Sequence, residues 1–290
     1  MSILKNNRIC ISGGSMSAEI DCHGAQLRSL KKDGCEILWQ GDDRFWTETA
    51  PVLFPVCGGL KDDKYKLFGR EYSLEKHGFA CNLDFDGQKL SENSARFRLQ
   101  SNEETLKKYP YNFVLTVTFT LSDDSLKTEY SVENLNDEDM YFSIGAHEGY
   151  ACKEGIEACE VIFNRSESFE TCLLDGGILS RNKQKILPDG KVLPLKESYF
   201  EIDGLIFENV NSDSVTLFNR ESGRRITVDF DGFENLLIWT IPGAGYVCIE
   251  PWSGFPDYSD TDGDFTKKNA IQKLAARGCV TKVHTVTVRQ

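Results

Sequence analysis

The sequence lacks the long apolar runs of a membrane protein and has few segments with the periodicity of an amphipathic helix. No run reaches about 18 apolar residues, and the N-terminus lacks the apolar core of a signal peptide. Ten cysteines occur, but no two form a Cys-x-x-Cys pair, which argues against a structural zinc site. Many of them lie in apolar, strand-like runs, where a free thiol acts as a small hydrophobe. We therefore expect a protein of the reduced cytoplasm, without membrane contact.

An excess of positive charge is also missing. The formal net charge is −12, from 45 acidic and 33 basic residues, which argues against nucleic-acid partners and anionic membranes and favours neutral ligands. The chain contains no low-complexity tract, no linker rich in proline, glycine or serine, and no repeat of fixed period. Its 290 residues, 40% of them hydrophobic, suffice for a large core. We expect a single domain over residues 1–290, and the sequence does not determine its oligomeric state.

Alternation of apolar and polar residues is the main pattern of the chain. In FVLTVTFTL, residues 113–121, every second residue is large and apolar and threonines occupy most of the other positions, which predicts a strand. Helix is expected only in short pieces, at 43–49 and 267–273. The pattern predicts an all-β protein of large, packed antiparallel sheets. Strands are expected at 113–121, 126–134, 215–219, 225–230 and 280–288, with shorter hairpins within 27–41 and 67–74.

The segment GYVCIEPWSGFPD, residues 245–257, places one carboxylate, Glu250, after an apolar strand-like run. Burial of a lone carboxylate is costly and raises its pKa. Pro251 biases Glu250 toward an extended backbone, so we expect the carboxylate at the end of a strand. With Trp252 nearby, the pattern is typical of a tuned general base beside a flat ligand. An ordinary strand-end glutamate paired with lysine or arginine is the alternative.

A second candidate lies at the end of YFSIGAH, residues 141–147. The small residues before His147 and Gly149 after it are expected to leave room for a ligand. A histidine in a pocket can be protonated near pH 7, as a general acid requires. The alternative is a structural histidine bonded to the neighbouring Glu148.

His77 is a weaker candidate, because its position before a glycine and a phenylalanine fits either a pocket or a capped turn. His23 and His284 are expected to be structural. A metal site formed by His77, His147 and Glu250 has no support from spacing, so no metal or other cofactor is expected.

The run APVLFPVCGGL, residues 50–60, contains two prolines that forbid a central strand or helix. Gly58 and Gly59 allow the backbone to approach another group closely. Apolar, irregular backbone of this kind lies over a core or lines a cavity.

Five motifs occur in order along the chain: residues 50–60, HGFA at 77–80, SIGAH at 143–147, DGLIF at 203–207 and CIEPW at 248–252. Taken together, they resemble the aldose 1-epimerase (galactose mutarotase-like) family, and most closely its LacX-like branch. They occur in the family's order and spacing over nearly the whole chain, and the combination is specific although no single motif is. The resemblance implies a galactose-mutarotase-like β-supersandwich and interconversion of the anomers of a free aldose without a cofactor.

By the family's pattern, Glu250 would be the base and His147 the acid. His77 would hold the sugar's ring or hydroxyl oxygens and Asp203 another hydroxyl. The chemistry fits these residue types, because anomer exchange removes the proton of the C1 hydroxyl while the ring oxygen gains one.

Two aromatic residues within or near these motifs are candidate sugar contacts. Trp252 and Tyr150 could each present a flat apolar face to sugar C–H groups, and core packing is the alternative for both.

The sequence departs from the family where relatives often carry arginine, at Gly59 and Cys81, and proline, at Glu148. Loss of two cations weakens the case for a phosphorylated substrate, because arginine is the usual phosphate ligand; Lys61 could replace one, but a solvated lysine is the simpler interpretation. If Glu148 lies close to His147, it should raise the pKa of the imidazole.

The alternatives to a free-aldose mutarotase are a hexose-6-phosphate mutarotase and a non-catalytic carbohydrate-binding protein on the same fold. A glycoside hydrolase ranks last, because it needs two carboxylates that flank one bond.

Overall fold

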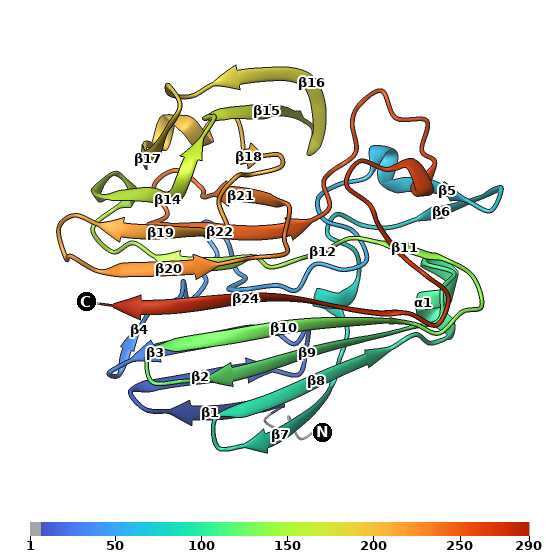
Figure 1. Cartoon of the computed structure of the whole chain (residues 1–290), viewed down its shortest axis with the longest axis horizontal. Coiled ribbons are helices and arrows are strands. Elements are labelled where there is room, and N and C mark those ends of the chain that lie inside the picture. Colours follow the sequence, from blue (N-terminus) through green and yellow to red (C-terminus); the bar gives the residue numbers. More distant parts are fainter. Residues whose placement is uncertain (1–6, 290) are drawn as a thin grey trace.

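The computed structural model describes residues 7–289. Residues 1–6, part of the N-terminal stretch that lacks a signal-peptide core, and residue 290 lie outside the described residues. Antiparallel sheets account for most of the chain (Figure 1), as the alternation predicts. Within residues 7–289, none of the helices is both long and apolar enough to cross a membrane.

The largest sheet has nine strands in the order β17-β14-β19-β20-β24-β10-β9-β8-β7. The C-terminal strand β24 lies between β20 and β10 and so joins the two halves of this sheet (Figure 1). In β9 and β10 every second residue is buried, which is why their sequences alternate. The strands are β7 Asp86–Ser91, β8 Ser94–Gln100, β9 Phe113–Leu121, β10 Ser125–Asn134, β14 Cys159–Glu167, β17 Gly190–Pro194, β19 Ser214–Asn219, β20 Arg225–Asp229 and β24 Cys279–Arg289.

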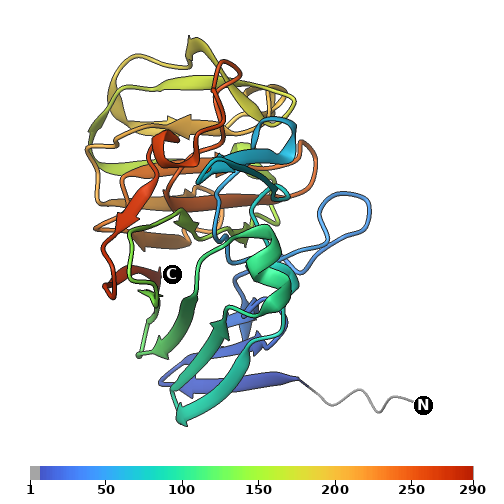
Figure 2. The ribbon, with the colours of Figure 1, turned by 90° about the vertical axis from the view of Figure 1, so that its right-hand side faces the viewer.

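A four-stranded sheet, β1-β2-β3-β4, packs beside β7, β8 and β9 at one end of the large sheet (Figure 2). Its apolar residues, such as Ile11, Ile20 and Leu30, belong to the same buried cluster as Phe97 and Phe119 of the large sheet. One continuous core therefore spans both sheets. The strands are β1 Arg8–Gly13, β2 Met16–Asp21, β3 Leu27–Lys32 and β4 Cys35–Glu36.

A five-stranded sheet contains Glu250 and Trp252, and His147 lies between two of its strands. It has the order β12-β22-β21-β18, and β13 also pairs with β22. All eight residues of β22 are buried, and they alternate between two environments: Val247 and Ile249 face the main core, whereas Cys248 and Trp252 face two smaller clusters on the other side. The strands are β12 Ile144–Gly145, β13 Glu148–Ala151, β18 Leu205–Phe207, β21 Asn235–Trp239 and β22 Tyr246–Ser253.

Three two-stranded pairs and short helices complete the structure. The pairs are β5 Lys64–Leu67 with β6 Arg70–Ser73, β11 Met140–Phe142 with β23 Gln272–Leu274, and β15 Glu170–Asp175 with β16 Ile178–Lys185. The helices are α1 Glu103–Lys108 and the 3-10 turns Lys61–Asp63, Ala80–Asn82, Ile156–Ala158, Glu197–Phe200 and Phe265–Lys267.

The expected strands are all present, and the expected helices are not. Residues 43–49 form turns and irregular backbone, and 267–273 hold only the end of a 3-10 turn and the start of β23. Residues 7–289 contain one α-helix, α1, which was not predicted. Its signal was local: Asn102 and Thr105 form a reciprocal capping box at its N-terminus, and Lys107 and Lys108 complement the dipole at its other end.

Candidate active site

Glu250 lies within β22, not at a strand end. The prediction that Pro251 would end the strand is wrong, because the strand continues to Ser253. Proline cannot donate a ladder hydrogen bond, so its presence in a central strand needs a substitute. Here the Ala146 N–H donates to the Pro251 carbonyl at 3.1 Å, and the Trp252 indole Nε1–H donates to the Ala146 carbonyl at 3.1 Å. The side chain of Trp252 thus supplies the donor that the proline backbone lacks, and this bond fixes its indole.

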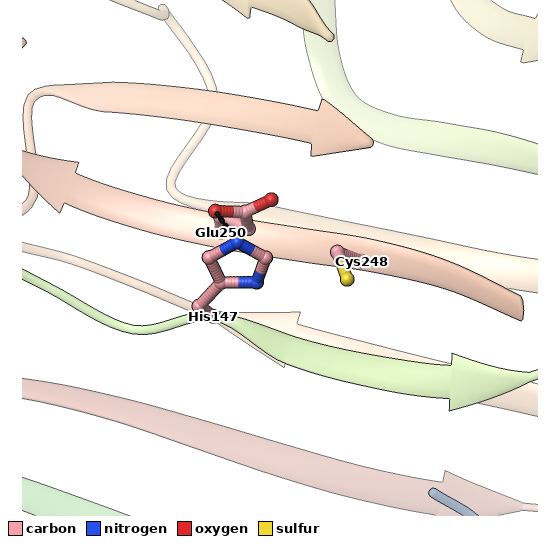
Figure 3. A group of neighbouring side chains, drawn as sticks. All are labelled: His147, Cys248 and Glu250. Atoms are coloured by element: carbon pink, nitrogen blue, oxygen red, sulfur yellow. Dashed lines mark ion pairs between the residues drawn. The ribbon is translucent and has the colours of Figure 1, made fainter. Parts of the chain in front are cut away.

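His147 lies in the two-residue break between β12 and β13, and the registers of these two strands place it opposite Glu250. Gly145 of β12 pairs with Trp252 and Glu148 of β13 pairs with Ile249, so Ala146 and His147 lie across from Pro251 and Glu250. The imidazole Nε2 lies 3.4 Å from a Glu250 carboxylate oxygen. Figure 3 shows the two side chains pointing toward each other. Both side chains are buried, at 8% and 0% exposure, and both Glu250 oxygens lack a hydrogen-bond partner among the described residues. A buried carboxylate with no donor is costly, which points to a ligand that supplies one.

Glu148 and Tyr150, in the strand β13 that follows His147, project to the opposite face of the sheet, because successive residues alternate. Glu148 faces His284, whose Nε2 lies 3.0 Å from its Oε1. The Tyr150 ring is fully buried in the main core, so the structure does not bring it into the cavity with the other predicted residues. The condition under which Glu148 would raise the pKa of His147 is not met, because the two side chains face opposite sides; burial instead lowers that pKa to about 3. His284 is buried beside Glu148, consistent with a structural role.

The glycines around His147 make room for tryptophans. A Cβ at Gly145 would lie 2.5 Å from the Trp252 ring, and one at Gly149 would lie 2.9 Å from the Trp46 ring. The prediction that these small residues leave space for a ligand is therefore wrong in detail: indole rings fill that space.

His77 enters the site from a loop, and residues 50–60 hold it there. It has a φ of 68°, and its backbone N–H donates to the Gly58 carbonyl at 3.0 Å. The Gly58 N–H in turn donates to Nδ1 of the His77 ring at 3.1 Å. Because a backbone N–H can only donate, Nδ1 must be the acceptor, so Nε2 carries the proton of the neutral ring and is a donor. Gly58 itself packs on Pro256 with no space for a side chain, which confirms the predicted close approach.

A cavity of about 330 Å³ brings the predicted residues together. Glu250, His147, His77, Asp203 and Trp252 all line it, and the His77 ring lies edge-on to both His147 and Trp252, with ring centroids 5.5 and 5.7 Å apart. The irregular run 50–60 contributes to the wall through residues 51, 53 and 58, as expected.

Three further residues of this cavity were not predicted. Trp46 stacks on His147, Trp239 meets the same ring edge-on, and Lys76 is the only lysine or arginine among the described lining residues. Lys76 immediately precedes His77, and that adjacency was the available signal. Nothing in the sequence around Trp46 indicates its partner.

Burial shifts the pKa values of the central pair toward their neutral forms. It raises the pKa of the Glu250 carboxyl well above its usual value, opposed in part by the charge of Lys76. Burial also lowers the pKa of His147 to about 3 and lowers the pKa of His77 well below its usual value. Although Glu250 and His147 lie at ion-pair distance, burial therefore favours a carboxylic acid beside a neutral imidazole when the cavity holds no ligand. The pair as a whole carries one transferable proton.

One group of side chains could hold a metal ion. Donor atoms of His147, Cys248 and Glu250 all lie within 4.8 Å of one another (Figure 3). A tetrahedral ion with bonds of about 2.0–2.3 Å needs its ligands closer together than the full width of this span. Burial also raises the pKa of the Cys248 thiol well above its usual value, which disfavours the thiolate that a metal would bind. The group fits a metal only after rearrangement.

The positions that depart from the family pattern lie differently with respect to the cavity. Cys81 lines it, and burial raises the pKa of its thiol to about 11. Gly59 is packed against the Gly177 carbonyl and is not part of the lining. Lys61 also lies outside, with its Nζ donating to the Ser259 carbonyl at 2.7 Å, so it does not replace a missing cation in the cavity.

The fold and the cavity define a class of protein: a β-supersandwich in which the carboxylate of Glu250 and the imidazole of His147 face each other at the wall of one pocket. The family model for aldose 1-epimerase matches residues 7–265, and the chain belongs to that family. Among its relatives, the plasmid-encoded protein LacX of Lactococcus lactis subsp. lactis is 35% identical over 284 residues, covering 91% of this chain and 94% of that protein.

Two solved structures agree closely with this one. A galactose mutarotase related enzyme from Lactobacillus acidophilus has a TM-score of 0.91 at 31% identity, covering 98% of this chain and 97% of the other. A galactose mutarotase-like protein from Lactobacillus casei has a TM-score of 0.91 at 29% identity, covering 97% of this chain and all of the other. The galactose-mutarotase-like fold expected from the sequence is thereby confirmed.

Proposed function

We propose that the protein is an aldose 1-epimerase that interconverts the α and β anomers of a free aldose, with Glu250 as base and His147 as acid. The observation that carries the proposal is the cross-strand pair itself: Nε2 and the carboxylate oxygen lie 3.4 Å apart at the wall of one cavity, and both Glu250 oxygens lack donors among residues 7–289. The hydroxyl groups of a sugar would supply those donors.

The reaction follows from the protons that Glu250 and His147 can take up and release. With Glu250 ionised and His147 protonated, the carboxylate takes the proton of the C1 hydroxyl and the imidazolium gives one to the ring oxygen. The C1–O5 bond breaks, the C1–C2 bond rotates, and the ring closes on the other carbonyl face as both protons return. General catalysis by each of the two groups accelerates the reaction by about 10²–10⁴-fold. Burial favours neutral Glu250 and neutral His147, which is the state of the pair after proton transfer, so it lowers the free energy of the ring-opened intermediate.

The remaining predicted residues have binding roles in this proposal. His77, with its proton on Nε2, donates to a sugar oxygen, and the Asp203 carboxylate accepts from a hydroxyl. Trp252 presents an apolar face. Tyr150 takes no part, since its ring lies in the main core.

The charge of the lining supports a neutral sugar over a hexose 6-phosphate. Lys76 is the one lysine or arginine of the described lining, whereas Glu48 and Asp203 are acidic beside Glu250. A phosphate group usually requires arginine forks or several cations. We expect turnover of glucose or galactose to exceed that of their 6-phosphates, and Lys76→Ala to leave turnover of the free sugars within about threefold of wild type.

Polarimetry tests the proposal. A fresh solution of one anomer should lose its excess rotation much faster with enzyme, and Glu250→Gln should abolish the acceleration. Glu148→Gln is the matched control, because Glu148 is equally buried on the neighbouring strand but faces away from the cavity; its activity should stay within about tenfold. A fully active Glu250→Gln variant would refute the assignment. Sugar binding in calorimetry without any acceleration would instead favour the carbohydrate-binding alternative.

A further inference from the structure

The imidazole of His147 lacks the hydrogen bond that usually orients a functional histidine. In such a ring the N–H of the second nitrogen commonly donates a hydrogen bond to a carboxylate or carbonyl, and this bond fixes the plane of the ring. Here Nδ1 is buried and has no partner among the described residues, while Nε2 faces Glu250. Another interaction must therefore hold the ring in the plane that aims Nε2 at the carboxylate.

The indole of Trp46 covers one face of this ring. The ring centroids lie 5.0 Å apart at an interplanar angle of 28°, a stacked arrangement. Trp46 belongs to the loop between β4 and β5, and its position is fixed through its carbonyl, which accepts from the Trp39 indole N–H at 2.8 Å and from the Asp42 N–H at 3.0 Å. The covering residue is thus itself held by two hydrogen bonds.

Three residues of the sheet pack around the Trp46 ring. Tyr246 of β22 stacks on it at 5.4 Å, and Trp239 of β21 meets it edge-on at 5.6 Å. Gly149 of β13 provides the third side, since a Cβ there would lie only 2.9 Å from the indole. Trp239 also meets the His147 ring edge-on, with centroids 5.7 Å apart. The indole therefore fits one orientation, and through stacking it imposes one on the imidazole.

We propose that Trp46 is a positioning residue that replaces the missing hydrogen bond and keeps the His147 imidazole aimed at Glu250 and at the sugar. The proposal rests on the function proposed above. It gives Trp46 two effects: it restricts rotation of the ring about its Cβ–Cγ bond, and it keeps water from that face of the ring. A misplacement of about 1 Å in a reacting group costs on the order of 10²-fold in rate.

The experiment compares Trp46→Ala and Trp46→Phe with wild type, and uses Phe45→Leu as a control on the same loop outside the cavity lining. Mutarotation kinetics give kcat and KM, and NMR follows the Cε1–H signals of the four histidines against pH, with His147→Asn assigning the signal. In Trp46→Ala we expect kcat to fall about 10- to 100-fold, KM to stay within about threefold, and the His147 titration midpoint to move up toward 6.5. Trp46→Phe should restore most of the wild-type kcat and most of the wild-type His147 titration midpoint. Phe45→Leu should match wild type in both.

Two results would overturn the proposal: a rise in KM with kcat unchanged, which would make Trp46 a platform for the sugar, or an unchanged His147 titration in Trp46→Ala. If Trp46→Ala does not fold, Gly149→Ala displaces the indole from the other side and should give the same two shifts. If wild type shows no mutarotase activity, the proposed function fails, but the NMR titration still decides whether the indole shields the imidazole.

Discussion

Replacement of Glu250 by glutamine should destroy activity and stabilise the fold at neutral pH. Glutamine keeps the shape of the side chain but cannot become charged. The Glu250 carboxyl is fully buried, neither oxygen accepts a hydrogen bond from the described residues, and burial raises its pKa. At pH 7 the folded protein therefore bears a cost that the unfolded chain, with a solvated carboxylate, does not.

The size of the stability gain in Glu250→Gln follows from the unpaired carboxylate oxygens of Glu250. A buried polar group without a partner costs about 1–3 kcal/mol, and more when charged. Because the amide of glutamine also lacks partners but can donate toward His147, we expect a net gain in unfolding free energy of about 1–2 kcal/mol at pH 7. For a chain of this size that corresponds to a rise in Tm of roughly 2–6 °C. Activity should fall by about 10²–10⁴-fold.

The pH dependence of the gain gives the sharper test. Since the folded pKa of Glu250 is raised, its contribution to stability is complete below the unfolded value of 4.5 and is lost as pH rises through the folded value. The two proteins should therefore be equally stable near pH 4, and the advantage of Glu250→Gln should grow toward pH 8, measured by urea unfolding. A variant less stable than wild type at pH 7 would refute this reasoning. It would mean that Glu250 and His147 form a stabilising charged pair.

Two further predictions concern other buried charges. The pKa of His147 is lowered to about 3, so wild type should lose stability as pH falls from 6.5 toward 3; His147→Asn should lose about 2–3 kcal/mol less than wild type between pH 6.5 and 4.5, as urea unfolding would show, and parallel curves would contradict this. Lys268 and Asp257 form a buried ion pair at 2.6 Å, and Lys268→Met should lower the unfolding free energy by about 3–5 kcal/mol because it leaves the carboxylate unpaired. The exposed pair of Arg181 and Asp260 offers the matched control, and Arg181→Met should cost less than about 1 kcal/mol. Equal losses in the two variants would show that burial of the Lys268 pair is unimportant.

Much of the fold could be predicted because its strands are half-buried. In β9, β10 and β24 one face contacts the core and the other is more exposed, so the sequence alternates visibly. The same principle fails in β22, where both faces are buried and the sequence shows no alternation. That is why the strand end was placed at Glu250: the continuation past Pro251 depends on a hydrogen bond from the Trp252 side chain, which no local pattern reveals.

The site was predicted in part, and the failures share a cause. His147 and Glu148 are neighbours in sequence but face opposite sides of the sheet, so proximity along the chain was a poor guide to contact. The alternation of successive side chains, counted from His147, would have placed Tyr150 on the face away from the cavity as well. Trp46 and Lys76 were missed for another reason: each reaches the cavity from a loop, and the rings that surround Trp46, those of Trp239 and Tyr246, lie far from it in sequence.

The opposition of His147 and Glu250 across adjacent strands has a consequence for how such a protein can change. Glu250 lies within β22, and His147 lies in the short break between two strands that both pair with β22, so buried strands fix the spacing of the two groups. His77, Asp203 and Lys76 instead reach the cavity from segments that do not pair with β22. Under the proposed function, catalytic competence and substrate preference would be encoded in separate parts of the chain, and exchange of the segments that carry His77, Asp203 and Lys76 would offer a route to new sugars that leaves the acid–base pair intact.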